Sequence, residues 1–222
     1  DMFIESQFNH PIGDWDVSNV TSMRWMFYGS QFNQPIGDWN VSNVTDMSGM
    51  FWTSDFNQPI GHWDVSNVIN MANMFSGSGL LYVLSKFNQD ISSWNVSSVT
   101  DMSGMFSLSV FNHPIGDWDV SSVTNMYDMF SDSSFNQPIG EWDVSSVTDM
   151  SAMFSSSSFN QPIGNWDVSN VTKMEGMFYN SSFNQDLSTW NVDNVIVCYY
   201  FNWDSSAWTL PKPNFTNCNP ES

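Results

Sequence analysis

Carboxylates that return at a fixed interval are the side chains of this chain best suited to chemistry. One set occupies a position that other repeats fill with polar residues: Asp14, Asp38, Asp117 and Glu141. A second set lies two residues further along and alternates with asparagine: Asp16, Asp64, Asp119, Asp143 and Asp167. Oxygen ligands stacked at the spacing of adjacent strands would suit Ca²⁺. Because asparagine replaces aspartate freely, a local turn onto the following serine is favoured, and we expect no metal site and no cofactor, with calcium as the alternative.

Together the two sets of carboxylates predict an acidic strip along one face of the molecule. Such a strip would meet a basic partner or a divalent cation, or it would serve only to keep the protein soluble. The whole chain has 23 acidic and 4 basic side chains and a formal charge of −19. This charge repels phosphate backbones and anionic lipid, so nucleic acid is not expected as a partner.

Three aromatic residues stand at positions that other repeats fill with small or polar residues: Trp25, Tyr28 and Trp52. Clustered aromatic side chains at such positions would form a contact for a sugar or a protein. The alternative is that they cover the end of the repeat array or pack against repeats further upstream. The apolar insertion 79–85 likewise is either a partner-binding loop or a tolerated bulge.

Residues that perform catalysis elsewhere are sparse and dispersed in this sequence. His10 and His113 share a repeat position but lie four repeats apart, and His62 occupies a different position. The Met-x-x-Met spacing of Met23 and Met26 would suit Cu(I), but its recurrence beside phenylalanine favours core packing. We therefore predict no catalytic residues and expect that the protein is not an enzyme.

The elements that position these side chains follow from an internal repeat. The dipeptide Phe-Asn returns every 24 residues, apart from one step of 31 that contains the insertion 79–85. Such periodicity is typical of stacked repeats. It predicts the end of a truncated upstream repeat at 1–7, eight repeats over 8–197 and a C-terminal cap over 198–222.

Each repeat is expected to contain one strand and one short helix. Ile12, Trp15 and Val17 are prone to β-structure and predict a strand that pairs with its copies in a parallel sheet. Met23, Met26 and Phe27 share one face of a helix, with Thr21 as its N-cap. The predicted fold class is an α/β solenoid, a leucine-rich-repeat-like stack of strand, turn and short helix.

The ends and the surface of the chain carry further signals. Cys198 and Cys218 predict one terminal disulfide, and Asn180 and Asn214 are candidate glycosylation sites in a secretory pathway. The apolar stretch 80–84 falls far short of the ~20 residues that cross a bilayer, so no membrane span is expected.

The repeated motif Phe-Asn-x-Pro-Ile-Gly-x-Trp-Asp-Val-Ser-x-Val-Thr-x-Met-x-x-Met-Phe resembles the BspA-like leucine-rich-repeat surface proteins, and in particular the Mycoplasma-type repeat of unknown function. The likeness covers about residues 1–197, and the tail from Trp208 to Cys218 resembles the terminal cap of such proteins. The resemblance implies an extracellular or cell-surface location, often with adhesion, and no catalytic activity.

Three functional hypotheses follow for this chain. The first is a secreted or surface-displayed module that binds a protein or glycan at a cell surface or in a matrix. The second is a spacer or building block of an extracellular assembly, formed by contacts with neighbouring copies. The third and weakest is carbohydrate or ice binding by a regular face, although the sequence has no paired outward columns of threonine.

Overall fold

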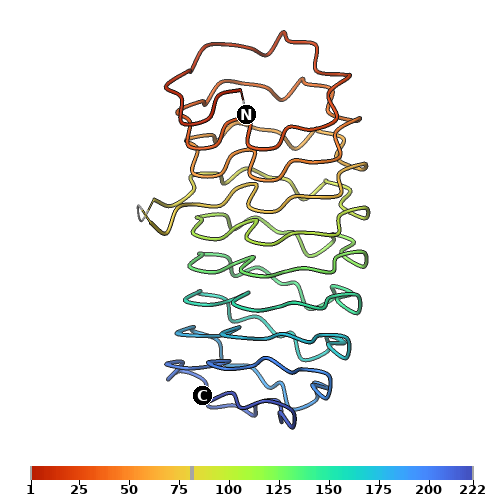
Figure 1. The fold of residues 1–222 in the computed structure, drawn as a ribbon, viewed down its shortest axis with the longest axis vertical. Coiled ribbons are helices and arrows are strands. Elements are labelled where there is room, and N and C mark those ends of the chain that lie inside the picture. The colour runs from red at the N-terminus through yellow and green to blue at the C-terminus, as the bar shows by residue number, and fades with distance from the viewer. Residues whose placement is uncertain (1, 81–82, 222) are drawn as a thin grey trace.

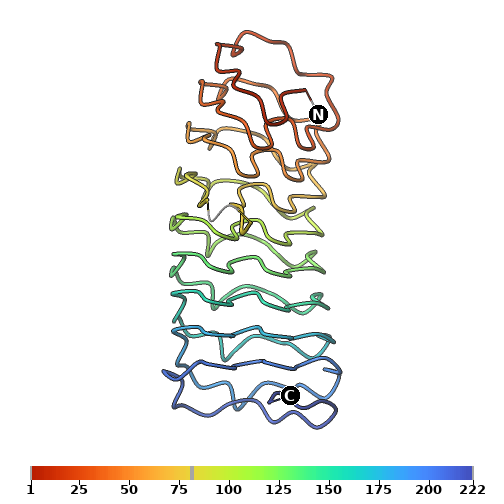
Figure 2. The ribbon, with the colours of Figure 1, turned by 60° about the vertical axis from the view of Figure 1, so that its left-hand side comes forward.

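The computed structural model describes residues 2–80 and 83–221, which form a stack of coils in chain order. Each turn of the chain lies on the preceding one, with the N-terminal coil at one end of the stack and the C-terminal residues at the other (Figure 1, Figure 2). Within the described ranges there is no helix and no extended strand. Adjacent coils are joined instead by isolated parallel bridges such as Ser22–Asp46 and Asp46–Asn70. The predicted α/β solenoid with a parallel sheet and short helices is therefore wrong.

The helix predicted around Met23 and Phe27 is replaced by consecutive turns. The amide of Met26 donates to the carbonyl of Met23 at 3.1 Å, and Ser30 donates to Phe27 at 3.1 Å. Between them Trp25 has a φ of 53° and Gly29 a φ of 63°, in the left-handed region. A left-handed residue in each turn ends the right-handed path, so no α-helix can propagate. The same two positions are left-handed in most other coils, where glycine, asparagine or aspartate often occupies them.

Backbone bonding between coils runs through this turn segment rather than through the predicted strand. Met23 donates to Asp46 at 2.8 Å and Phe27 to Met50 at 2.9 Å, both in the next coil. Alternate amides close local turns, so the ladder never becomes a continuous strand. The segment from Ile12 to Val17 instead contains a turn, in which Trp15 donates to Ile12 at 3.1 Å.

Threonine acts between coils rather than at a helix N-terminus, which corrects the predicted cap. The hydroxyl of Thr45 donates to the carbonyl of Thr21 at 3.2 Å, and the amide of Thr45 donates to the same oxygen at 2.8 Å. Similar pairs join Thr100, Thr124, Thr148 and Thr172. Where threonine occupies this position it links its coil to the one before it, whereas Ile69 and Ile196 provide only the backbone bond.

The core is a continuous column of apolar side chains shared by all coils. Phe27 stacks on Phe51 of the next coil with ring centroids 5.6 Å apart, and on Phe32 of its own turn at 4.2 Å. Met47, Met50 and their copies in the later coils are fully buried, whereas Met26 in the first coil is half-buried. Burial of this apolar area is the main favourable term that holds the stack together.

Two ladders of side chains reinforce the core from coil to coil. The indole Nε1 of Trp39 donates to the carbonyl of Ile12 at 3.1 Å, and the later tryptophans repeat this bond. The Asn9 carboxamide accepts from the amide of Asn33 at 2.9 Å, and its copies continue to Asn184, which accepts from Thr209. Each coil therefore satisfies polar groups of its neighbour.

The ends and the insertion are built from the same contacts. Phe3 donates to Met26 and stacks on Phe27, so residues 2–7 continue the stack. The described residues of the insertion, 79–80 and 83–85, leave the stack (Figure 1). Two backbone bonds join Ser78 and Val83, and Leu80 is 95% exposed. Leu81 and Tyr82 lie outside the described residues.

The C-terminal residues cover the last coil with copies of the same bonds. Trp208 donates from its indole to Gln185 at 3.0 Å, and the Asn217 carboxamide donates to Asp193 at 2.6 Å. A disulfide joins Cys198 to Cys218, whose Cα atoms are 5.9 Å apart. Cys198 is fully buried and occupies the position of the core methionines.

Candidate functional site

The three aromatic residues selected from the sequence lie together around one apolar depression. Trp25, Tyr28 and Trp52, with Ile4, line a volume of about 300 Å³, here named the N-terminal aromatic hollow. The rings of Tyr28 and Trp52 meet edge to face, with centroids 5.2 Å apart. Trp25 is 37% exposed and Ile4 is 38% exposed. The hollow thus presents aromatic surface to solvent.

Neighbouring coils hold the rings of this hollow in place. A Cβ added to Gly49 would lie 2.3 Å from the Trp25 ring. The absence of a side chain at Gly49 therefore provides the space that the Trp25 ring occupies. The Arg24 guanidinium lies 4.1 Å from the Trp25 ring centroid, a cation–π contact. The Trp52 indole donates to the Gly77 carbonyl at 2.7 Å. These contacts fix the aromatic surface before any partner arrives.

A second aromatic depression lies toward the C-terminal coils, and two of its residues share repeat positions with the first: Tyr200 with Trp25, and Tyr179 with Tyr28. Tyr127, Tyr179 and Tyr200 surround a volume of about 250 Å³ with Glu175, here named the tyrosine hollow. Its floor is made of small residues: Ser151, Ala152, Ser155 and Gly176. The sequence analysis missed this site. The signal was the same as for Trp25, since large aromatics replace small residues at these repeat positions.

Burial and negative charge act together on the tyrosine hollow. Partial burial raises the pKa of the Tyr127 phenol, and the carboxylates of Asp128, Asp149 and Glu175 raise it further. All three carboxylates disfavour a phenolate because it would add another negative charge nearby. Three carboxylates therefore lie close enough to the Tyr127 phenol to act on its ionisation.

Between the two hollows, one repeat position holds only small side chains. The repeat position of Tyr28 and Trp52 is occupied by serine in the next four coils: Ser76, Ser107, Ser131 and Ser155. Tyr179 then occupies it in the coil that follows. The described residues of the insertion, 79–80 and 83–85, belong to the coil that also contains Ser76. One face of the stack therefore carries aromatic depressions toward both ends and small side chains between them.

The acidic columns lie at the surface and engage in local turns. Asp64 accepts from the amide of Ser66 at 3.1 Å and from its hydroxyl at 2.6 Å, and Asn40 accepts from Ser42 in the same way. In four aspartates of the second set, hydrogen bonds from the serine two residues later in the chain lower the pKa of the carboxyl group: Asp16, Asp64, Asp119 and Asp167. Asp143 accepts from the Ser145 amide at 3.0 Å.

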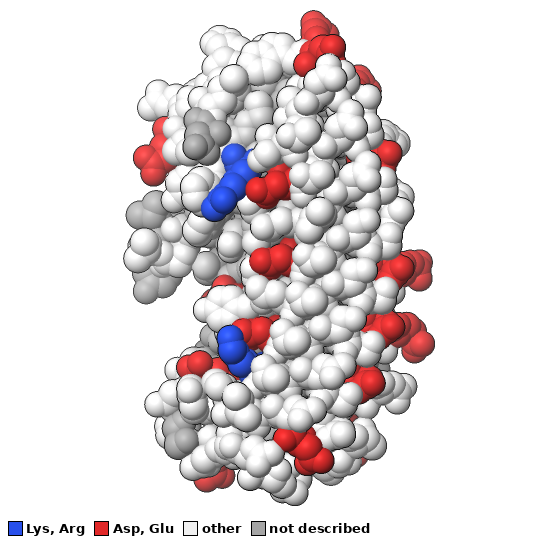
Figure 3. Space-filling view, turned by 45° about the vertical axis from the view of Figure 1, so that its right-hand side comes forward, with Lys and Arg blue, Asp and Glu red and all other residues white. Residues whose placement is uncertain are grey.

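The other predicted carboxylates lie on the exposed outer side of the coils: Asp14, Asp38, Asp117 and Glu141. On the side of the molecule in Figure 3, acidic side chains recur along the stack and basic ones are few. Among the described residues no three His, Cys, Asp or Glu side chains converge in a way that would hold a metal ion. Serine satisfies one carboxylate oxygen in the second set and leaves the other toward solvent.

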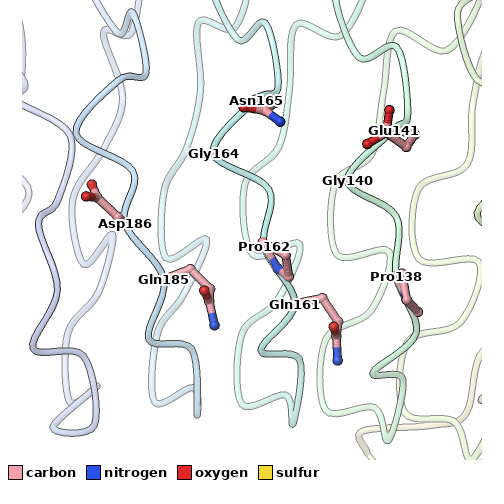
Figure 4. A pocket seen from close by; sticks show the side chains of 9 residues that line it. All are labelled: Pro138, Gly140, Glu141, Gln161, Pro162, Gly164, Asn165, Gln185 and Asp186. Atoms are coloured by element: carbon pink, nitrogen blue, oxygen red, sulfur yellow. The ribbon is translucent and has the colours of Figure 1, made fainter.

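A polar groove runs across the coils beside these carboxylates. It has a volume of about 500 Å³ and lies between Pro138 and Asp186 (Figure 4). Gln161 and Gln185 extend from successive coils in the same direction, and each amide donates to an asparagine of the preceding coil. The amide donors of these two glutamines are thus already used in holding the stack. Glu141, Asn165 and Asp186 line the groove together with proline and glycine.

The remaining candidate residues are scattered over the molecule. His113 contacts the Asn88 carbonyl at 3.0 Å, His10 lies edge-on to Phe8, and His62 is exposed in another coil. Asn180 and Asn214 are both exposed. In the described parts of the chain no helix is long and apolar enough to cross a membrane.

Comparison with known proteins identifies one family. Its model, described as "Mycoplasma protein of unknown function, DUF285", matches three overlapping stretches, at residues 1–81, 78–156 and 109–209. The matches together cover the coils and the start of the cap. No curated protein and no solved structure matches the chain.

Proposed function

The chain belongs to the DUF285 family of Mycoplasma-type repeat proteins of unknown function, and from this premise we propose that it is a binding module and not an enzyme. The observation that carries the proposal is the N-terminal aromatic hollow, where Trp25, Tyr28 and Trp52 leave aromatic surface uncovered. Exposed apolar surface rimmed by polar residues marks interaction sites on soluble proteins. Rigid aromatic side chains lose little conformational entropy on binding, which suits them to hold a macromolecular partner.

The partner is a protein or glycan at a cell surface or in an extracellular matrix. Two observations support this location. The motif resembles BspA-like surface proteins, and a disulfide joins Cys198 to Cys218, a bond that persists in oxidising compartments. Adhesion by a displayed repeat array is the corresponding role.

The test uses substitutions that copy other coils of the same protein. Trp25→Gly, Tyr28→Ser and Trp52→Ser introduce the residues that sister coils carry at these positions, so the backbone stays compatible. Wild type and the triple variant are screened against matrix proteins and glycans by surface plasmon resonance, with and without calcium. The proposal expects a partner whose affinity falls at least about tenfold in the variant. Equal binding by both proteins, with unchanged thermal unfolding, contradicts this role for the hollow.

A structural spacer is the second candidate, and the continuity of the side-chain ladders favours it. The asparagine and tryptophan bonds recur in every coil, including across the insertion, where Asn88 donates to Asn57 at 3.0 Å. A stack bonded this regularly suits a rigid rod. Deleting residues 111–134, one whole repeat, distinguishes the two roles. A spacer keeps its assembly with a shorter reach, whereas a binding module with its site at Trp25 and Trp52 keeps its affinity unchanged.

Carbohydrate or ice binding by a regular face has weaker support. The single threonine column donates its hydroxyls to the preceding coil, as Thr124 does to Thr100 at 3.2 Å. These hydroxyl protons are therefore already engaged. The glycan arm of the screen tests carbohydrate binding directly.

A further inference from the structure

The tyrosine hollow differs from the N-terminal aromatic hollow in its charge, and this difference points to a ligand. We propose that the tyrosine hollow binds an exposed arginine or lysine side chain of a basic protein surface. This proposal rests on the proposed binding function and specifies the chemistry of one partner. Tyr127, Tyr179 and Tyr200 come from three different coils, and Glu175 stands beside them in the same coil as Tyr179.

The geometry suits a single cationic side chain. Aromatic rings attract cations that lie over their faces within about 6 Å of the centroid, and tyrosine is an effective partner. The hollow of about 250 Å³ is smaller than the roughly 300–1,000 Å³ of pockets for small molecules. Its floor of serine, alanine and glycine leaves room for the aliphatic part of the side chain, which aromatic walls would also cover.

The charges around the hollow complement such a ligand. Asp128, Asp149 and Glu175 all act on Tyr127, and the whole chain has a formal charge of −19. The nearby Lys173 is paired with Asp149 at 3.1 Å. Glu175 is exposed and forms no ion pair within residues 2–80 and 83–221. A guanidinium or ammonium group entering the hollow would therefore find an unpaired carboxylate beside the rings.

The protein itself shows the proposed contact at the equivalent place in an earlier coil. Arg24 shares the repeat position of Tyr127 and Glu175, and its guanidinium lies 4.1 Å from the Trp25 ring centroid. At the C-terminal cap, the Lys212 ammonium lies 5.5 Å from the centroid of Trp208. In the tyrosine hollow the aromatic rings are present, but glutamate replaces the arginine. The hollow thus offers the aromatic half of a contact whose cation must come from another molecule.

The test uses an uncharged-ended peptide of alternating glycine and arginine, titrated into the full chain by isothermal calorimetry. Glu175→Gln removes the charge and keeps the shape, and Glu221→Gln is its control, because Glu221 is exposed and belongs neither to the hollow nor to the acidic strip. Tyr127→Leu removes a ring face, and Tyr199→Leu is its control because Tyr199 is exposed but does not line the hollow. We expect each hollow variant to bind about five-fold to ten-fold more weakly than its control, from the loss of one charge or one cation–π contact. Affinity should also fall as salt rises.

Two results would overturn this inference. If Glu175→Gln and Glu221→Gln weaken binding equally, only the overall negative charge attracts the peptide. If a neutral glycan competes for the hollow and Glu175→Gln leaves its affinity unchanged, the hollow is a sugar site. Neither result decides the proposed binding function. The test of that function depends on Trp25, Tyr28 and Trp52 and not on the tyrosine hollow.

Discussion

Glycine in the Pro-Ile-Gly turn permits a close approach between neighbouring coils. A Cβ added to Gly140 would lie 2.7 Å from the Pro162 carbonyl oxygen, and one added to Gly116 would lie 2.7 Å from that of Pro138. These neighbours are backbone atoms of a fully bonded coil, so they have little freedom to move away. A single missing side chain therefore sets the spacing of the stack on this side.

We expect Gly140→Ala to lower the free energy of unfolding by about 1–3 kcal/mol, because the new methyl group forces two coils apart. Gly79→Ala is the matched control, since its nearest neighbour is the Leu108 side chain at 3.7 Å. This control should change stability by less than about 0.5 kcal/mol. Urea unfolding followed by circular dichroism measures both. Equal stability of the two variants would show that the coils can separate at no cost.

The aspartates that accept from serine link stability to pH. Bonds from Ser66 lower the pKa of Asp64, and bonds from Ser121 lower that of Asp119. A lowered pKa in the folded state means that these carboxylates stabilise the fold above their unfolded pKa of about 3.9. This contribution disappears as the pH falls through the lower, folded pKa.

We expect the double variant Asp64→Asn, Asp119→Asn to unfold with a shallower dependence on pH below about 5 than the wild type does. At neutral pH the turn itself should persist, because Asn40 and Asn95 accept from serine in the same geometry. Urea midpoints collected between about pH 2 and pH 7 measure the difference. Parallel profiles for the two proteins would show that the serine bonds do not favour the charged form.

At the scale of the element, each turn segment depends on residues in the left-handed region. Ala152 has a φ of 56° and Asn73 a φ of 55°, whereas Gly104 occupies the same position with a φ of 62°. This conformation costs an ordinary residue about 1–2 kcal/mol, a cost that glycine avoids. The strain is tolerated because each such residue directs its neighbours' amides toward the next coil.

We expect Ala152→Gly to stabilise the protein by up to about 1 kcal/mol. A helical segment would give the opposite sign, since glycine in a helix interior costs about 1 kcal/mol relative to alanine. Ala72→Gly is the control, because Ala72 is not in the left-handed region. Glycine at this position only raises the conformational entropy of the unfolded chain, which lowers the stability of the fold. Thermal unfolding distinguishes the variants. A loss of stability in Ala152→Gly would contradict the turn conformation.

At the scale of the whole molecule, the cap protects the apolar column where the coils end. Phe178 and Phe183 meet the Trp208 ring at centroid distances of 5.1 and 4.9 Å. The disulfide between Cys198 and Cys218 holds the covering segment closed over a sequence separation of 20 residues. Stacked repeats need such terminal covers, because an open end exposes core to solvent.

We expect reduction of the disulfide to lower stability by roughly 3 kcal/mol, since closing a loop of this length restricts the unfolded chain. The segment after Cys198 should become the first site of proteolytic cleavage. Limited trypsin or chymotrypsin digestion with mass spectrometry locates the cuts. A Cys218→Ala variant should behave like the reduced protein and be insensitive to reductant. An unchanged digestion pattern would show that Trp208 and Asn217 hold the cap without the disulfide.

Much of the molecule was determined by the sequence alone. The 24-residue spacing of Phe8 and its copies predicts which side chains share an environment, because identical segments that stack must bury the same positions. The grouping of Trp25, Tyr28 and Trp52 followed from the same register, and the structure places these rings around one hollow. The periodicity therefore predicts which side chains form each column, and it also indicates the first candidate site.

Only the tertiary structure decided how the backbone runs between those columns. Spacing of three and four residues at Met23, Met26 and Phe27 fits a helix, but it equally fits turns interrupted by left-handed Trp25. Turns prevail because each coil can donate alternate amides to the next, as Met23 does to Asp46, a partner 23 residues away in sequence. That choice depends on bonds between coils, which no single repeat contains. The tyrosine hollow arises for the same reason, since four consecutive coils must stack before Tyr127 and Tyr200 can face one space.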